Sequence, residues 1–330
     1  MQNLLDPAIL FFIFGVFAGA IRSNLEIPEA IAKFLSLYLL MALGLKGGFA
    51  LAQSGLTLDV ALALLSAIAM AFVVPLLAYT ILHRFIDGFN AAAMAASYGS
   101  VSAVTFLTAM QYLEQQDLMF GGHMAVAMVL MESPAILIAI IIANRLRHNK
   151  ALASQSDTSR AMLKQTAMTG IIHESLTNGA HLLLLGAMVV GLLSGDKGMA
   201  VMQPFSSDLF KGMLSFFLLD MGLIVARSFR DALNASPFLL AYAVIAPFVH
   251  AALALGLGQL LALALPDKVL LMVLSASASY IVVPAVLRHA IPEAKPVYYL
   301  GLSLGITFPL NILLGIPLYT FIAKTLEALL

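Results

Sequence analysis

The chain carries one pattern of apolar helices twice. Residues 1–145 and 171–322 each contain five apolar segments of about the length that crosses a bilayer. Four landmarks recur in the same order, and the second member of each pair follows the first by 172 to 178 residues. The pairs are a glycine in a leucine-rich run (Gly44 and Gly222), an interior proline (Pro75 and Pro247), a cluster of small and hydroxyl residues (99–103 and 275–279) and a second interior proline (Pro134 and Pro309). Because five is odd, the second copy must enter the bilayer upside down, an arrangement typical of secondary transporters.

Composition agrees with a membrane protein. Of the 330 residues, 62% are hydrophobic and 10% are charged, whereas a soluble domain is typically about 45–50% apolar and about 25% charged. The surplus apolar surface is expected to face the lipid bilayer. A formal net charge of zero argues against nucleic acid as a partner. The sequence has no cysteine, which excludes disulfides and thiolate metal sites.

The sequence predicts an all-α integral membrane protein with ten transmembrane helices in two inverted five-helix repeats. Residues 1–146 form the first repeat, residues 147–170 a polar linker, and residues 171–330 the second repeat. The predicted spans are 6–22, 30–53, 57–83, 90–114, 121–146, 172–194, 207–228, 236–265, 268–290 and 297–323.

The distribution of basic residues supports this topology. If the linker is cytoplasmic, twelve of the seventeen Lys and Arg residues lie on the cytoplasmic side and four lie outside, with Lys46 left within the membrane. Lys and Arg are retained on the cytoplasmic side of bilayers. We therefore expect a multi-pass protein of the plasma (inner) membrane, with both termini extracytoplasmic and the linker cytoplasmic.

The fourth and ninth predicted helices differ from the others. Each carries its cluster of small and hydroxyl residues midway along the span, and Pro284 follows the second cluster. Such residues weaken a helix, so both helices are predicted to break near the middle of the membrane. Each break would expose a helix N-terminus, and two N-termini facing one pocket lined with serines suit a small anion. Alternatively, the small residues only allow helices to pack closely.

Polar groups at membrane depth are candidates for coupling to a cation. Glu132, which precedes Pro134, is a candidate Na⁺ ligand or proton carrier; alternatively it bonds backbone groups that the proline frees. Asp220 is a candidate cation ligand, or else a partner of Lys46. Asn311 either meets an ion or bridges interrupted backbone.

Enzymatic function is not expected. The sequence lacks a Walker loop, and residues 99–103 do not match the nucleophile elbow of hydrolases. Glu132 and Asp220 lack a known catalytic spacing for an intramembrane protease. A passive anion channel is a further alternative. Buried acidic residues and broken helices argue against it, because they indicate a closed binding site instead of a continuous pore.

Along almost its whole length, the sequence resembles the sodium-dependent bicarbonate transporter family known from cyanobacteria, the SbtA type. The matching segments occur in the family's order, and their order and spacing are more specific than any one of them. They include Gly44-Leu45-Lys46-Gly47-Gly48, Gly99-Ser100-Val101-Ser102, Met131-Glu132-Ser133-Pro134-Ala135, Ala246-Pro247-Phe248-Val249-His250 and Ser275–Ser279 with Pro284.

The resemblance implies Na⁺-coupled uptake of a small anion such as bicarbonate, with no other cofactor. It also implies a homotrimer, an elevator-like movement of one domain against another, and a possible PII-like cytoplasmic regulator. The substrate contacts that it implies are Ser100, Val101, Ser102, Ala103, Thr105, Ser277, Ser279 and Tyr280.

The sequence resembles a divergent member of this family. The bicarbonate transporters carry an acidic residue after the serines of the ninth helix, where this sequence has Tyr280, followed by the apolar run 281–283. A more apolar pocket leaves open a different small carboxylate as the substrate. It also leaves open coupling to H⁺ through Glu132 instead of Na⁺.

Overall fold

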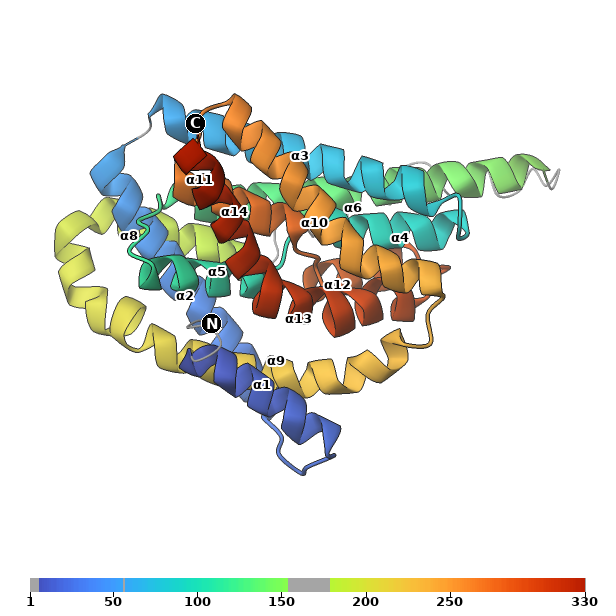
Figure 1. Cartoon of the computed structure of the whole chain (residues 1–330), viewed down its shortest axis with the longest axis horizontal. Helices are drawn as coiled ribbons and strands as arrows, with labels where there is room; N and C mark the ends of the chain where they lie inside the picture. The colour runs from blue at the N-terminus through green and yellow to red at the C-terminus, as the bar shows by residue number, and fades with distance from the viewer. Residues whose placement is uncertain (1–5, 56, 154–178, 330) are drawn as a thin grey trace.

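The computed structural model describes residues 6–55, 57–153 and 179–329, and these residues form helices and no strand (Figure 1). By length and apolar composition, seven helical segments of this described part are able to cross a membrane. The helices of the first half are α1 (Pro7–Ala20), α2 (Glu29–Ser54), α3 (Leu58–Leu82), α4 (Gly88–Gly99), α5 (Ala103–Gln115) and α6 (His123–Ala153). Those of the second half are α8 (Gly179–Gln203), α9 (Phe210–Ala232), α10 (Pro237–Leu260), α11 (Leu265–Ala276), α12 (Val282–Ala290), α13 (Phe308–Leu310) and α14 (Ile316–Leu329).

Several helices begin at side chains that satisfy their first free backbone N–H groups. Asp6 accepts hydrogen bonds at the start of α1, Thr57 at the start of α3, Asp87 at the start of α4 and Ser236 at the start of α10. Such a cap contributes about 1 kcal/mol, so these residues determine where the apolar segments begin.

The predicted helices and the structure differ in three places. The helix predicted over 121–146 continues as α6 to Ala153, and the rest of the predicted linker lies outside the described residues. The helix predicted to end at 194 is followed by a kink at Gly195, whose φ of 53° is not helical, and a second helical stretch of α8 continues from there to Gln203. The last predicted helix contains the wide turns η4 (Val297–Gly301), η5 (Ser303–Thr307) and η6 (Asn311–Gly315).

Four helices form a layer that we call the frame. In it α1 packs along α9, and α2 packs along α8 (Figure 1). The remaining helices, α3 to α6 and α10 to α14, form the second layer, which we call the core. Within the core, α3 packs on α4 and α6, and α10 packs on α11.

The repeated glycines of the sequence lie at close contacts between the frame helices. A Cβ atom on Gly44 of α2 would lie 2.3 Å from the carbonyl oxygen of Leu184 in α8. A Cβ atom on Gly222 of α9 would lie 2.3 Å from the carbonyl oxygen of Phe12 in α1. Each glycine therefore allows the second helix of one half to pack against the first helix of the other half.

Candidate functional site

Two helices of the core are interrupted where the small and hydroxyl clusters occur. The first interruption separates α4, which ends at Gly99, from α5, which begins at Ala103. Ser100 and Ser102 are extended there, and Gly99 packs so closely on Pro75 that a Cβ atom would lie 2.4 Å from the proline Cβ. The second interruption, residues 277–281, separates α11 from α12. Both predicted breaks are present.

Hydrogen bonds tie the two interruptions to each other. The Ser279 amide donates to the carbonyl of Ser97 at 2.8 Å, and the Ser97 hydroxyl donates to the carbonyl of Ser279 at 2.7 Å. The Ser102 amide donates to the Ser277 hydroxyl at 3.0 Å. Because all four residues are buried, these bonds replace those that the interrupted helices lose.

A cavity of about 60 Å³ opens beside the interruptions. It lies between α2, α6 and the first residues of α5 and α12. Its lining consists of Ser36, Leu40, Val101, Ser102, Ala103, Met128, Glu132, Ser279, Tyr280, Ile281 and Val282.

The polarity of this cavity comes from helix ends and hydroxyl groups. Two helix N-termini, those of α5 at Ala103 and of α12 at Val282, contribute to its wall. Helix N-termini carry unsatisfied N–H groups and a partial positive charge, which favour an anion. The lining includes no Lys or Arg, and its one charged side chain is Glu132, which is buried. An anion and an ionised Glu132 would repel each other unless a cation or a proton neutralised one of them.

Five of the predicted substrate contacts line the cavity, namely Val101, Ser102, Ala103, Ser279 and Tyr280. Three others lie behind the wall. The Ser277 hydroxyl accepts from the Ser102 amide and donates to the Leu274 carbonyl. The Thr105 hydroxyl donates to the Ser102 hydroxyl at 3.0 Å. Ser100 is buried, and its hydroxyl has no hydrogen-bond partner among the described residues.

Tyr280 belongs to the second interruption. Its ring packs on Phe308, with the ring centroids 5.0 Å apart, and its hydroxyl is buried beside Ser102. Because Tyr280 also lines the cavity, its hydroxyl is available to a ligand there.

The three candidate coupling residues occupy different places. Glu132 lines the cavity, whereas Asp220 lies buried on α9 of the frame and is not among the lining residues. The alternative that Asp220 pairs with Lys46 is wrong, because the Lys46 ammonium lies 3.0 Å from the carboxylate of Glu114.

Asn311 bridges interrupted backbone, which is one of the two roles predicted for it. Its amide donates to the carbonyl of Ala276, the last residue of α11, at 2.9 Å. Its oxygen accepts from the Tyr319 hydroxyl, also at 2.9 Å. The side chains of Asn311 and Tyr319 thereby hold the end of α11 next to the cavity.

Replacing Asn311 with alanine is expected to destabilise the protein, because it leaves the Ala276 carbonyl and the Tyr319 hydroxyl buried without partners. Each such group costs about 1–3 kcal/mol. Tyr319→Phe, which removes one bond only, should lower the melting temperature less. Thermal unfolding in detergent measures both, and equal melting temperatures for Asn311→Ala and the unchanged protein would contradict this role.

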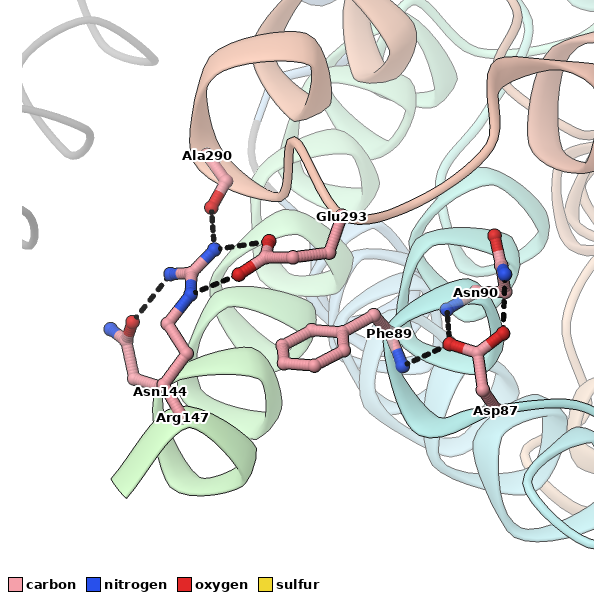
Figure 2. A network of polar contacts seen from close by, with 7 residues as sticks. All are labelled: Asp87, Phe89, Asn90, Asn144, Arg147, Ala290 and Glu293. Atoms are coloured by element: carbon pink, nitrogen blue, oxygen red, sulfur yellow. Dashed lines mark hydrogen bonds and ion pairs between the residues drawn. The ribbon is translucent and has the colours of Figure 1, made fainter. Parts of the chain in front are cut away.

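An arginine anchors the far end of α12. Arg147, near the end of α6, donates to both carboxylate oxygens of Glu293, at 2.8 and 2.7 Å, and to the carbonyl of Ala290 at 2.9 Å (Figure 2). Ala290 is the last residue of α12, where a positive charge complements the helix dipole. The short helix that presents its N-terminus to the cavity is thus held at its C-terminus.

The start of α4 is fixed beside this arginine. Asp87 accepts from the amides of Phe89 and Asn90, and the Asn90 side chain accepts from the Lys295 amide at 2.7 Å. The Arg147 guanidinium lies over the Phe89 ring, 5.9 Å from its centroid (Figure 2). The start of α4 and the end of α12 are therefore connected at the same end of the core.

Several residues of the site are absent from the sequence prediction. Ser36 and Leu40 come from α2, and Met128 comes from α6, whereas Ile281 and Val282 belong to the apolar run that was expected to make the pocket more apolar. Ser97, which ties the two interruptions together, lies two residues before the predicted cluster. A serine adjoining the cluster was a usable signal for Ser97. Ser36 stands in an apolar run, and its usable signal was the matching serine of the other repeat, Ser215.

Comparison with known proteins gives one family. The model of the Na⁺-dependent bicarbonate transporter superfamily matches residues 7–324, nearly the whole chain. Among curated proteins, none matches the chain significantly.

Proposed function

Because the chain belongs to the Na⁺-dependent bicarbonate transporter superfamily, we propose that it takes up a small anion, such as bicarbonate, together with a cation. The observation that carries this proposal is the cavity where two interrupted helices meet. The N-termini of α5 and α12 and the hydroxyls of Ser102 and Ser279 contribute to its wall. Discontinuous helices whose N-termini point at an anion are a recurring arrangement in secondary transporters.

Glu132 supports the coupling to a cation. A carboxylate at membrane depth costs about 2.5–3.5 kcal/mol, and next to a bound anion it would be still less favourable. A Na⁺ ion that Glu132 binds at the same time as the anion removes this repulsion. The two solutes would then bind together or not at all, which is the requirement for cotransport. The coupling ion is Na⁺ in this proposal, with H⁺ on Glu132 as the alternative.

The apolar part of the wall favours a second candidate substrate. Leu40, Met128 and Ile281 line the cavity beside the polar groups. Bicarbonate has no apolar surface to place against them, whereas a small organic carboxylate does. The phenol of Tyr280 is able to donate to either anion. Competition of small carboxylates with bicarbonate for uptake distinguishes the two substrates.

The contacts between helices support an inverted repeat of ten spans. In that scheme α1 and α8 are the first helices of the two halves, and α2 and α9 are the second ones. A two-fold axis in the membrane plane would place α1 on α8 and α9 on α2. It would therefore turn the contact between α1 and α9 into the contact between α8 and α2, and both contacts are extensive. We propose that the frame stays fixed while the core moves, as an elevator. The homotrimer and the cytoplasmic regulator stay predictions.

Removing a hydroxyl from the cavity is expected to weaken anion binding. Ser102→Ala and Ser279→Ala each delete a hydroxyl that lines the cavity, and a hydrogen bond to a charged group contributes about 1.5–3 kcal/mol. Each variant should therefore raise the anion concentration that gives half-maximal uptake by about 10- to 100-fold. The measurement is uptake of labelled bicarbonate into proteoliposomes.

A buried serine outside the cavity provides the control. Ser66 is also buried, and its hydroxyl donates to the Leu62 carbonyl within α3. Ser66→Ala should leave the half-maximal concentration unchanged. If all three variants behave alike, the cavity is not the anion site.

A further inference from the structure

Two polar links join the frame to the core at neighbouring residues of α5. The Lys46 ammonium of α2 lies 3.0 Å from the carboxylate of Glu114. The Gln115 side-chain amide donates to the carboxylate of Asp6, the residue that caps α1. Glu114 and Gln115 are the last two residues of α5, whose first residue lines the cavity. One end of this helix therefore meets the anion site, and the other is held by two frame helices.

The backbones of the two layers also touch next to these links. A Cβ atom on Gly122, just before α6, would lie 2.0 Å from the carbonyl oxygen of Gly47 in α2. The two backbones are therefore in direct contact at this point. Another contact between the layers is apolar: the rings of Phe12 and Phe308 pack with their centroids 5.5 Å apart. Apolar surfaces slide without losing directional bonds, whereas an ion pair must be broken.

The ion pair has room to open. Lys46 and Glu114 border a cavity of about 150 Å³ that Gly47, Gly121 and Gly122 also line. Their side chains are 20% and 30% exposed, so water reaches both when they separate. Lys46 is also about 9 Å along α2 from Leu40, the nearest residue of that helix in the wall of the anion cavity, at a rise of about 1.5 Å per residue. The ion pair is therefore distinct from the anion site.

We propose that Lys46–Glu114 and Asp6–Gln115 form a latch that closes one side of the transporter and that must open in each transport cycle. The inference rests on the proposed function. By the distribution of Lys and Arg, the latch is on the extracytoplasmic side. While it is closed, the core cannot move along the frame to expose the anion cavity to that side. When it opens, Lys46 and Glu114 become separately hydrated.

Cross-linking tests the latch directly, because the chain has no cysteine of its own. In the variant Lys46→Cys with Glu114→Cys, a short bifunctional thiol reagent that reduction cleaves joins the frame to the core. A reagent is needed, because a direct disulfide requires Cα atoms within about 7 Å. The expected result is at least a ten-fold loss of uptake on cross-linking and recovery on reduction. Full uptake with the link in place, or folded protein that does not cross-link, would overturn the proposal.

A matched pair within the frame serves as the control. The side chains of Gln53 in α2 and Asp196 in α8 are 3.0 Å apart, and both residues belong to the frame. Cross-linking Gln53→Cys to Asp196→Cys should leave uptake unchanged, because no movement separates them. Loss of uptake in both pairs would attribute the effect to the reagent and count against the latch.

A distance measurement separates the latch from the transported substrate. Spin labels at Gln53→Cys in the frame and at Met119→Cys, an exposed residue after α5, report the position of the core. Adding Lys46→Gln should produce a second population of distances, or enlarge an existing one, without any substrate. Identical distributions with and without Lys46→Gln would contradict the latch. If uptake fails for every anion tested while the distances change, the proposed function fails and the latch stands.

Discussion

Glu132→Gln is expected to make anion binding independent of Na⁺ and to abolish uptake driven by a Na⁺ gradient. The substitution keeps the size of the side chain and its ability to form hydrogen bonds, but removes the charge. Two like charges about 4 Å apart repel by about 4 kcal/mol at an effective dielectric constant of 20, which corresponds to about a thousand-fold in affinity. In the unchanged protein Na⁺ therefore permits anion binding by neutralising the Glu132 carboxylate. In the variant this charge is absent, so the anion should bind equally well without Na⁺.

Binding of labelled bicarbonate to purified protein, with and without Na⁺, measures this effect. The comparison variant is Asp220→Asn, which removes the same charge from α9, outside the cavity lining. It is expected to keep the Na⁺ dependence. If Glu132→Gln binds the anion with the same Na⁺ dependence as the unchanged protein, Glu132 is not the coupling group.

Gly222→Ala is expected to destabilise the frame. The added Cβ atom would lie 2.3 Å from the carbonyl oxygen of Phe12, so α9 and α1 must move apart. Overpacking of this kind costs about 1–3 kcal/mol, which outweighs the gain of about 0.5–1 kcal/mol from replacing glycine with alanine in a helix. The melting temperature in detergent should fall.

Gly212 on the same helix is the matched control. It is exposed, and a Cβ atom there would have no other atom within 4 Å. Gly212→Ala should therefore leave the melting temperature unchanged or raise it. Equal effects of Gly222→Ala and Gly212→Ala would mean that the close contact of α1 with α9 does not hold the frame together.

The main features of the fold follow from local signals in the sequence. Apolar segments of membrane length predict the helices, and the clusters at 99–103 and 275–279 predict the two interruptions, because serine and glycine have low helix propensity and Pro284 removes a backbone donor. The structure adds the reason why the glycines repeat. Gly44 and Gly222 each lie at a close contact between two frame helices, a function that their positions in the sequence do not reveal.

The sequence predicted that the two interruptions meet, but other contacts between distant segments could not be predicted. The repeat suggested Asp220 as a partner for Lys46, but Glu114 occupies that place, because α5 ends beside α2. Ser36 enters the cavity wall only because α2 passes the interruptions there. Helix ends were missed for a different reason. The polar sequence after residue 146 indicates a linker, although charged residues continue a helix readily once it projects into water.

Uptake of labelled bicarbonate into proteoliposomes containing the purified protein tests the central claim most directly. The vesicles receive an inward Na⁺ gradient in one experiment and an equal K⁺ gradient in another, at the same pH on both sides. Coupled transport through the cavity beside Glu132 predicts accumulation with Na⁺ and none with K⁺. Equal uptake under both gradients, or no uptake of bicarbonate or of any small carboxylate by correctly inserted protein, would contradict it.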